Sequence, residues 1–309
     1  MQLNPEDKVK SSKSAKLDSV MKSPKGNFIR CVARNSIRNR ISISAASLAF
    51  HWCLAIFPAA IALVGLAHLL TLSTKQINSI SHGFTVLLPG DAASLVTQAL
   101  KLPESSGTSG VAFATGLVVS LWSMTGAMAS LQVGLDVAFD IKKDKGLLKR
   151  RIASIPLVGI SILLGGAASV LLVLGGQIAN YIIGSLYQSN FLGLKVITTL
   201  LIYLGAAAIV LVLISIYYIF GPNRGHIILR NLRIKDIFNR GAFVALILWV
   251  SSSILSSYYF QHFGRQLHNY GVFADVTVLL LWLYLTSASV LIGAETSREL
   301  ERRLGASEQ

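Results

Sequence analysis

The chain has 309 residues, of which 53% are hydrophobic and only 14% are charged. Soluble domains usually carry about 25% charged residues, so the composition argues against an ordinary soluble protein. A formal net charge of +14 is typical of nucleic-acid-binding proteins. Here, however, the basic residues are spread between apolar segments along the whole chain, which argues against that class.

The first 26 residues are polar and rich in serine and lysine. Such a segment buries too little apolar surface to fold by itself, so residues 1–26 are predicted to be a disordered basic tail. The apolar run that follows exceeds the roughly 7–15 residues of a signal-peptide core, which predicts an uncleaved anchor. The tail either only helps to orient the chain or also contacts anionic lipid headgroups.

Six apolar runs follow, and each can cross a hydrocarbon core about 30 Å thick at about 1.5 Å per helical residue. Lipid offers no hydrogen bonds to an exposed backbone, so the runs are predicted to be helices. They are Ile43–Leu70, Gly110–Leu131, Ile152–Ile183, Val196–Ile219, Gly241–Tyr258 and Val276–Ile292. We therefore predict an all-α integral membrane protein, a six-transmembrane-helix bundle at residues 27–303, with a short tail at 304–309.

The segments between these runs alternate between basic and nearly uncharged. Of the 28 Lys and Arg residues, 24 lie in residues 1–42, in the loops after the second and fourth runs, and after the sixth run. The other loops hold only Lys75, Lys101, Lys195 and Arg265. Because basic segments stay on the cytoplasmic side, the alternation predicts that both termini are cytoplasmic.

The first run carries a histidine and a proline. Pro58 lacks a backbone N–H and should kink the helix near Leu54. His51 lies about two turns inside the run, where an ionisable group is costly and is therefore a functional candidate. It either hydrogen-bonds at Ser47, one turn back, as a neutral structural histidine, or titrates in a polar pathway.

The long exterior loop at 71–109 contains Pro89-Gly90-Asp91, which predicts a turn followed by a helix N-cap. Apolar residues on one helical face follow, at Leu95, Val96, Ala99 and Leu100. This pattern predicts a short helix on the outer membrane surface or over the end of the bundle.

Few acidic residues lie near the membrane. Asp136 and Asp140, spaced by four just below the second run, are predicted to share one helical face, near Lys143 and Arg151 in the sequence. They form either a cytoplasmic gate or headgroup site, or an ion pair at a helix end. Asp275, at the outer edge of the sixth run, is either part of a polar pathway or an N-cap.

The fifth run is rich in serine, with Ser253 and Ser257 spaced by four. These hydroxyls either line a polar cavity or bond to carbonyls of their own helix and pack closely. At the inner end of the sixth run, Glu295 is predicted to pair with Arg298 on a solvated helical face.

Several segments, in this order around the six runs, resemble the YihY/BrkB family of bacterial inner-membrane proteins. They are Ala45–Phe50 with Leu54–Pro58, Trp122–Arg151, Tyr217–Pro222, Tyr270-Gly271, and Leu281–Leu285 with Gly293-Ala294-Glu295. The resemblance implies an inner-membrane protein with six helices and both ends in the cytoplasm. It implies no established activity, although members have carried a ribonuclease label and some are linked to virulence or serum resistance. The family usually has an aromatic residue at position 51 and often Asn at position 136, so His51 and Asp136 depart from its pattern.

The sequence contains no GxSxG, HExxH, GxxxxGK[ST] or CxxC motif. We therefore expect neither enzymatic activity nor a metal or cofactor. A membrane-bound ribonuclease is a third alternative, although phosphodiester hydrolysis usually needs metal ligands or paired acid and base groups. The expected partners are membrane lipids with anionic headgroups at the cytoplasmic face, and no nucleic acid.

Two functional hypotheses follow. The first is transport or translocation of a lipid, an amphiphile or a small solute. Its candidate pathway or gate residues are His51, Asp136, Asp140, Ser253, Ser257 and Asp275, with Pro58 as a kink. The alternative is a non-transporting membrane scaffold for envelope assembly or resistance, which recruits partners through its basic tail.

Overall fold

The structure is a computed structural model that describes residues 24–70, 78, 109–142, 146–186, 192–223, 239–267 and 272–307. The elements in these ranges are helices: α2 (Pro24–Arg38), α3 (Ile41–Leu69), α6 (Ser109–Ala138), α7 (Leu147–Leu186), α8 (Leu192–Phe220), α10 (Arg240–Leu267) and α11 (Val272–Ser307). All except α2 are long and apolar enough to cross a membrane. The all-α class and the six predicted spans are confirmed.

The candidate spans match the apolar runs in number and order, but the second and sixth continue further toward the basic end, and the first and third stop earlier at the opposite end. They are Ile41–Ala62, Phe113–Ala138, Leu148–Leu172, Val196–Phe220, Arg240–Tyr259 and Val276–Arg303. The second span therefore includes Asp136, and the sixth includes Glu295 and Arg298. The charged side chains in these extensions have partners on other segments of the chain, as shown below.

The helix α2 was not predicted from the sequence. It ends at Arg38, and Arg40 then adopts a φ of 51° before α3 begins at Ile41. This left-handed residue turns the chain sharply between the two helices. The predicted tail overlaps α2 from Pro24, and its first 23 residues lie outside the described part of the chain, as does the helix predicted after Pro89.

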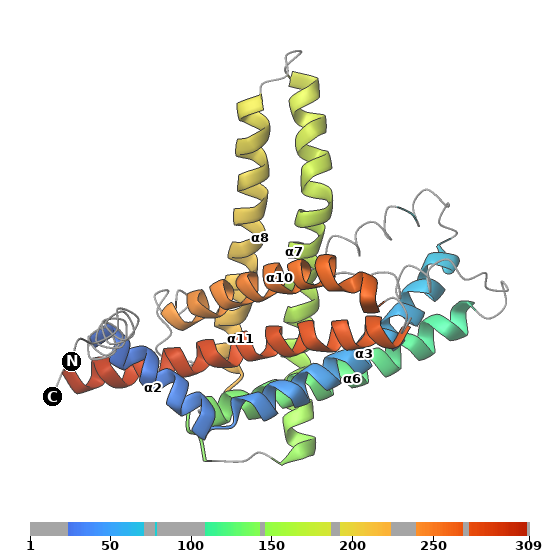
Figure 1. The fold of residues 1–309 in the computed structure, drawn as a ribbon. Helices are drawn as coiled ribbons and strands as arrows, with labels where there is room; N and C mark the ends of the chain where they lie inside the picture. Colours follow the sequence, from blue (N-terminus) through green and yellow to red (C-terminus); the bar gives the residue numbers. More distant parts are fainter. Residues whose placement is uncertain are drawn as a thin grey trace.

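Four helices, α3, α6, α10 and α11, run side by side, whereas α7 and α8 form an antiparallel hairpin that crosses them and extends beyond them (Figure 1). The helices α3 and α11, far apart in the sequence, pack against each other, and α8 packs against α10. The start of α2 and the end of α11 lie at the same end of the molecule (Figure 1). There the Arg303 guanidinium lies 5.0 Å from the centre of the Phe28 ring.

Glycines set the closest approaches between helices, as in many membrane proteins. A Cβ atom at Gly116 of α6 would lie 2.6 Å from the backbone nitrogen of Ala62 in α3. A Cβ atom at Gly241 of α10 would overlap Ser297 and the Gly293 carbonyl of α11. Both helix pairs therefore depend on the missing side chain.

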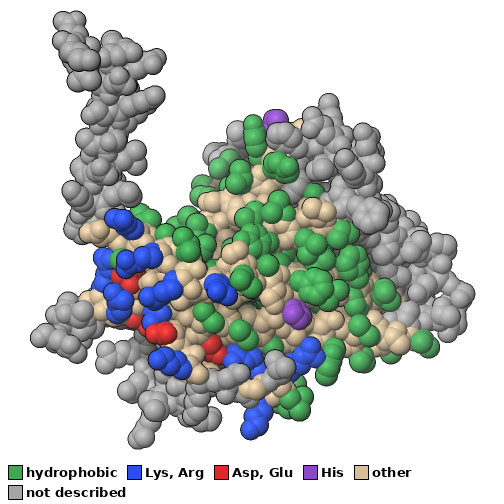
Figure 2. All heavy atoms as spheres, turned by 60° about the horizontal axis from the view of Figure 1, so that its bottom comes forward, with side chains coloured by type: hydrophobic (Ala, Val, Ile, Leu, Met, Phe, Trp, Pro, Cys, Tyr) green, Lys and Arg blue, Asp and Glu red, His purple; other side chains and the backbone are tan. Residues whose placement is uncertain are grey.

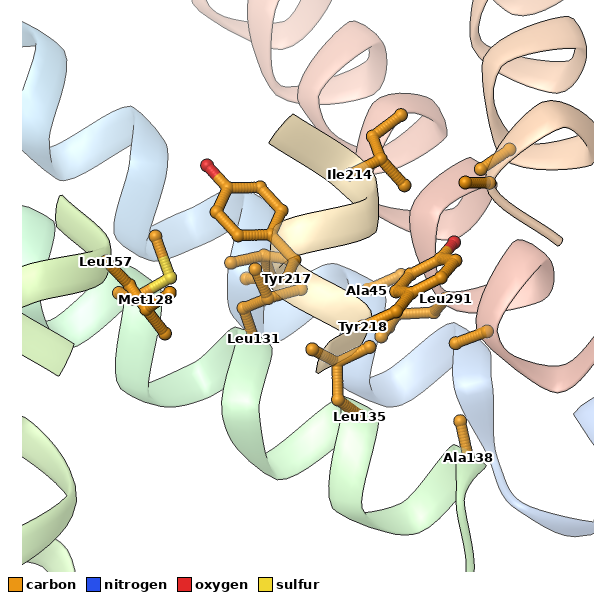
Figure 3. Packing of buried hydrophobic residues seen from close by; sticks show 14 of the residues in the cluster. Ala45, Met128, Leu131, Leu135, Ala138, Leu157, Ile214, Tyr217, Tyr218 and Leu291 are labelled. Atoms are coloured by element: carbon orange, nitrogen blue, oxygen red, sulfur yellow. The ribbon is translucent and has the colours of Figure 1, made fainter. Parts of the chain in front are cut away.

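The main buried cluster combines residues of α3, α6, α7, α8, α10 and α11 (Figure 3). Tyr217 and Tyr218, in the last turn of α8, point to different sides of this cluster (Figure 3). The Tyr217 hydroxyl lies 2.6 Å from Ser161 Oγ of α7, and the Tyr218 hydroxyl donates to the Val290 carbonyl of α11 at 2.5 Å. The end of α8 is thus fixed to two other helices.

Charged and apolar side chains separate on the surface. Figure 2 shows Lys, Arg, Asp and Glu gathered toward one end and the lower edge of the face in view, with apolar side chains over the rest. A membrane protein needs this separation, because hydrocarbon can cover the apolar part while charged groups reach the interface.

Candidate functional site

Asp136 lies in the last turn of α6 and has a partner on each carboxylate oxygen. One oxygen accepts a hydrogen bond from Arg150 Nη1 at 2.7 Å, and the other accepts from the Asn223 backbone N–H at 2.7 Å. The side chains of Arg150 and Asp136 are only 7% and 8% exposed. The carboxylate therefore joins α6 to the first turn of α7 and to the segment that follows α8.

Asp140 does not share a helical face with Asp136, so this prediction was wrong. The helix ends at Ala138, and Asp140 adopts a φ of 56°, which takes its side chain out of the helical register. Its carboxylate accepts a hydrogen bond from Arg298 Nη2 of α11 at 2.7 Å, and its side chain is 62% exposed. The two aspartates thus belong to separate ion pairs.

Glu295 is almost completely buried in α11, at 1% exposure. Its Oε1 accepts a hydrogen bond from the Asn39 side-chain amide, at the corner between α2 and α3. Its Oε2 has no partner within the described part of the chain. The predicted solvated pair with Arg298 is wrong, because α2 packs beside α11 and Arg298 instead turns toward Asp140.

His51 of α3 makes the contact that its spacing from Ser47 predicted. Its Nδ1 lies 2.8 Å from the Ser47 carbonyl oxygen and 3.3 Å from Ser130 Oγ of α6. A carbonyl can only accept, so Nδ1 carries the proton toward Ser47. In the neutral ring Nε2 is then an acceptor, and it has no hydrogen-bond partner among the described residues.

Arg151 points toward His51 and not toward either aspartate. Its guanidinium carbon lies 4.5 Å from the centre of the Trp122 ring, a cation–π contact. A Cβ atom at Gly126 would lie 3.2 Å from Arg151 Nη2 and 3.2 Å from His51 Cδ2. Gly126 therefore lets side chains from α3 and α7 meet over the middle of α6.

An apolar groove of about 570 Å³ lies between α6 and α7 and includes Trp122 in its wall. Its lining residues are Val118, Val119, Leu121, Trp122 and Thr125 of α6, and Ile155, Val158, Gly159 and Ile162 of α7. The Thr125 hydroxyl donates to the Trp122 carbonyl at 2.7 Å. Most of the lining side chains are exposed, so the groove opens outward, where a membrane protein meets lipid.

Two residues of α7, Ser154 and Pro156, lie next to groove residues in the sequence. Ser154 is fully buried, and its hydroxyl lies 3.1 Å from the Thr125 carbonyl and 2.6 Å from the Arg151 carbonyl, which holds the two helices together at one end. Pro156 has no N–H to donate to the Ile152 carbonyl, one turn back. The sequence analysis did not single out this proline.

The remaining predicted residues lie away from the groove. Ser253 of α10 accepts a hydrogen bond from the Trp282 indole at 3.2 Å, and Ser257 is half-buried on the same helix. Asp275 lies three residues after the start of α11, so it does not precede that helix as an N-cap would, and its side chain is outside the described part. Pro58 lies within α3, which continues as a helix through it.

In the sequence, Arg151 is one of the basic residues that indicate topology and a neighbour of the aspartates, and the groove beside it was not predicted. Lining residues recur at Val118, Trp122 and Thr125, and at Ile155, Gly159 and Ile162, intervals of three or four. Such stripes occur on every apolar span, so they indicate a groove only when the partner helix is known.

Comparison with known proteins was informative at the level of the family. A family model described as "Virulence factor BrkB" matches residues 32–309. The ribonuclease-like protein YfkH of Bacillus subtilis (strain 168) is 26% identical over 264 residues, 84% of this chain and 89% of that protein. A UPF0761 membrane protein of Tolumonas auensis is 37% identical over 60 residues, 19% of this chain and 20% of that protein. No solved structure matches the chain.

Proposed function

This chain belongs to the virulence factor BrkB family. We propose that it translocates a membrane amphiphile by holding the acyl chain in the groove between α6 and α7. The observation that carries the proposal is the groove itself, which is apolar, outward-facing and built between two candidate spans. Ligand pockets typically measure about 300–1,000 Å³, and the groove lies within that range.

The lining chemistry favours an amphiphile over a small polar solute. Apolar side chains make nearly the whole wall, and the Thr125 hydroxyl already donates to a backbone carbonyl. A sugar or an ion would lose its hydration there without gaining hydrogen bonds, at a cost of several kcal/mol. An acyl chain loses nothing, and it can enter sideways from the bilayer.

The proposal assigns no catalytic step to this chain. "Ribonuclease-like" is the description of the Bacillus subtilis relative, and phosphodiester hydrolysis needs an acid, a base or a metal at the reacting bond. The groove lining supplies no carboxylate, imidazole or amine. We assign membrane lipids as the partners, and no nucleic acid.

We further propose that the protein lies in the bacterial cytoplasmic membrane with both termini inside. This orientation is supported by the Lys and Arg residues, of which 24 lie in the segments assigned to the inside and four in the loops assigned to the outside. The position of α2 beside the end of α11 is consistent with it, because both termini then leave the membrane on one side.

The test is transfer of a fluorescent phospholipid between leaflets of vesicles that contain the purified full-length protein. Wild-type protein is expected to accelerate transfer above protein-free vesicles. Gly159→Leu should slow it severalfold, because a Cβ atom at Gly159 meets open space and the larger side chain fills the groove without a clash.

Gly165→Leu is the matched control. Gly165 lies on the same helix, a Cβ atom there also meets nothing within 4 Å, and the residue does not line the groove. This variant should transfer lipid like wild type. No acceleration by wild-type protein across lipids of several headgroups, or equal rates in the Gly159→Leu and Gly165→Leu vesicles, would overturn the proposal.

A further inference from the structure

We propose that the groove selects an amphiphile with an anionic headgroup, and that Arg151, held on Trp122 beside His51, binds that headgroup. The inference rests on the proposed function of the groove and adds the chemical class of its ligand. Arg150 and Arg151 are adjacent in the sequence but have different partners. Arg150 meets the buried carboxylate of Asp136, whereas Arg151 lies over an aromatic ring.

Arg151 differs in its partner from Arg150 and from three arginines of α11. Arg298 pairs with Asp140, and Arg302 and Arg303 both pair with Glu299. No carboxylate of the described residues pairs with Arg151. A cation near hydrocarbon is costly without a counter-charge. The face of an aromatic ring attracts the cation, but the ring has no net charge and does not neutralise it. An anionic headgroup would supply the missing charge.

The surroundings of Arg151 suit a phosphate or carboxylate. A guanidinium presents five N–H donors in one plane and binds such anions through two parallel hydrogen bonds. Gly126 brings the His51 ring to the same patch, so an imidazole lies beside the guanidinium. The site thus offers planar donors above a groove that is otherwise apolar.

Arg151 and the groove are close enough along α7 for one lipid to place its headgroup at Arg151 and its acyl chain in the groove. Arg151 is the fourth residue of the span Leu148–Leu172, and Ile162 is the groove residue of α7 farthest from it along the chain. Eleven residues at about 1.5 Å each make this distance about 16 Å. A lipid with its headgroup at Arg151 would lay an acyl chain along the groove.

The test measures binding and not transfer. The full-length protein in mild detergent is titrated with phosphatidylglycerol or with phosphatidylcholine of the same acyl chains, and bound lipid is counted by native mass spectrometry. Wild type should bind phosphatidylglycerol about tenfold more tightly. Arg151→Ala should abolish that preference, whereas Lys149→Ala, which removes an exposed charge from the same helical turn, should keep it.

Two further variants make the outcome decisive. Arg151→Lys keeps the charge but loses the planar donors, and should retain part of the preference. Gly159→Leu should weaken both lipids equally by filling the groove. A preference that survives in Arg151→Ala, or is absent in wild type, overturns the inference. If Gly159→Leu still slows transfer in that case, the proposed function stands without this headgroup site.

Discussion

Arg150 of α7 and Asp136 of α6 form a buried ion pair at 2.7 Å, and the second oxygen of that carboxylate accepts the backbone N–H of Asn223. One side chain thereby fixes the ends of three helices at the basic end of the molecule. The Asp140–Arg298 pair has the same length but is mostly exposed on the aspartate side. The two pairs offer a direct comparison of buried and exposed charge in one protein.

Asp136→Ala is expected to lower the free energy of unfolding by about 3–5 kcal/mol, because it leaves Arg150 buried without a counter-charge. Asp140→Ala should change it by at most about 1 kcal/mol, because the pair is screened by water. Both values can be measured by denaturant unfolding of the detergent-solubilised protein. Replacing Asp136 and Arg150 together by Leu and Met should recover much of the loss; a double variant as unstable as Asp136→Ala would contradict this explanation.

Gly241→Ala should destabilise the packing of α10 on α11 by about 1–3 kcal/mol, because the added methyl group overlaps Ser297 and the Gly293 backbone. Gly159→Ala is the matched control on α7, where a Cβ atom meets open space. Its stability should lie within about 1 kcal/mol of wild type, since alanine favours a helix over glycine. Equal melting temperatures for the two variants would argue against the close contact.

Tyr218→Phe removes the hydrogen bond from α8 to the Val290 carbonyl of α11. The expected cost is about 0.5–1.5 kcal/mol, because the carbonyl remains available to its own helix and no cavity forms. Tyr203→Phe, on the exposed face of the same helix, should leave the unfolding midpoint unchanged. A shift of the same size in both variants would mean that the Tyr218 hydroxyl is not specifically engaged.

Trp122→Leu keeps the groove apolar but removes the ring under Arg151. Cation–π contacts contribute about 0.5–2 kcal/mol, so the preference for phosphatidylglycerol should fall severalfold but not vanish. Trp249→Leu, on α10 and outside the groove lining, serves as the control in the same lipid titration. An unchanged preference in Trp122→Leu would show that the ring does not help to hold the guanidinium.

The orientation can be tested with reporter fusions. Green fluorescent protein fused after Gln309 should fluoresce, because the basic segments predict a cytoplasmic C-terminus. Alkaline phosphatase inserted after Ser105, in the loop between the first and second runs, should be active because that loop is expected outside. Active phosphatase at the C-terminus would reverse the proposed orientation.

Local spacing in the sequence predicts a contact correctly where both residues lie on one helix. His51 reaches the Ser47 carbonyl because residues four apart lie one above the other on a helix. The prediction from spacing was wrong for Asp136 and Asp140, where the same rule was extended past the end of α6. The partners Arg150 and Arg298 lie 14 and 158 residues away, so spacing on one helix could not identify them.

The sequence by itself determined the membrane class, the number of spans and their positions, because about 20 consecutive apolar residues can satisfy their backbone in lipid only as a helix. The tertiary structure decided which charges meet. Arg150 and Arg151 are adjacent and alike in the sequence, yet successive helical residues point about 100° apart. One therefore reaches the buried carboxylate of Asp136, and the other lies on Trp122 at the end of the groove.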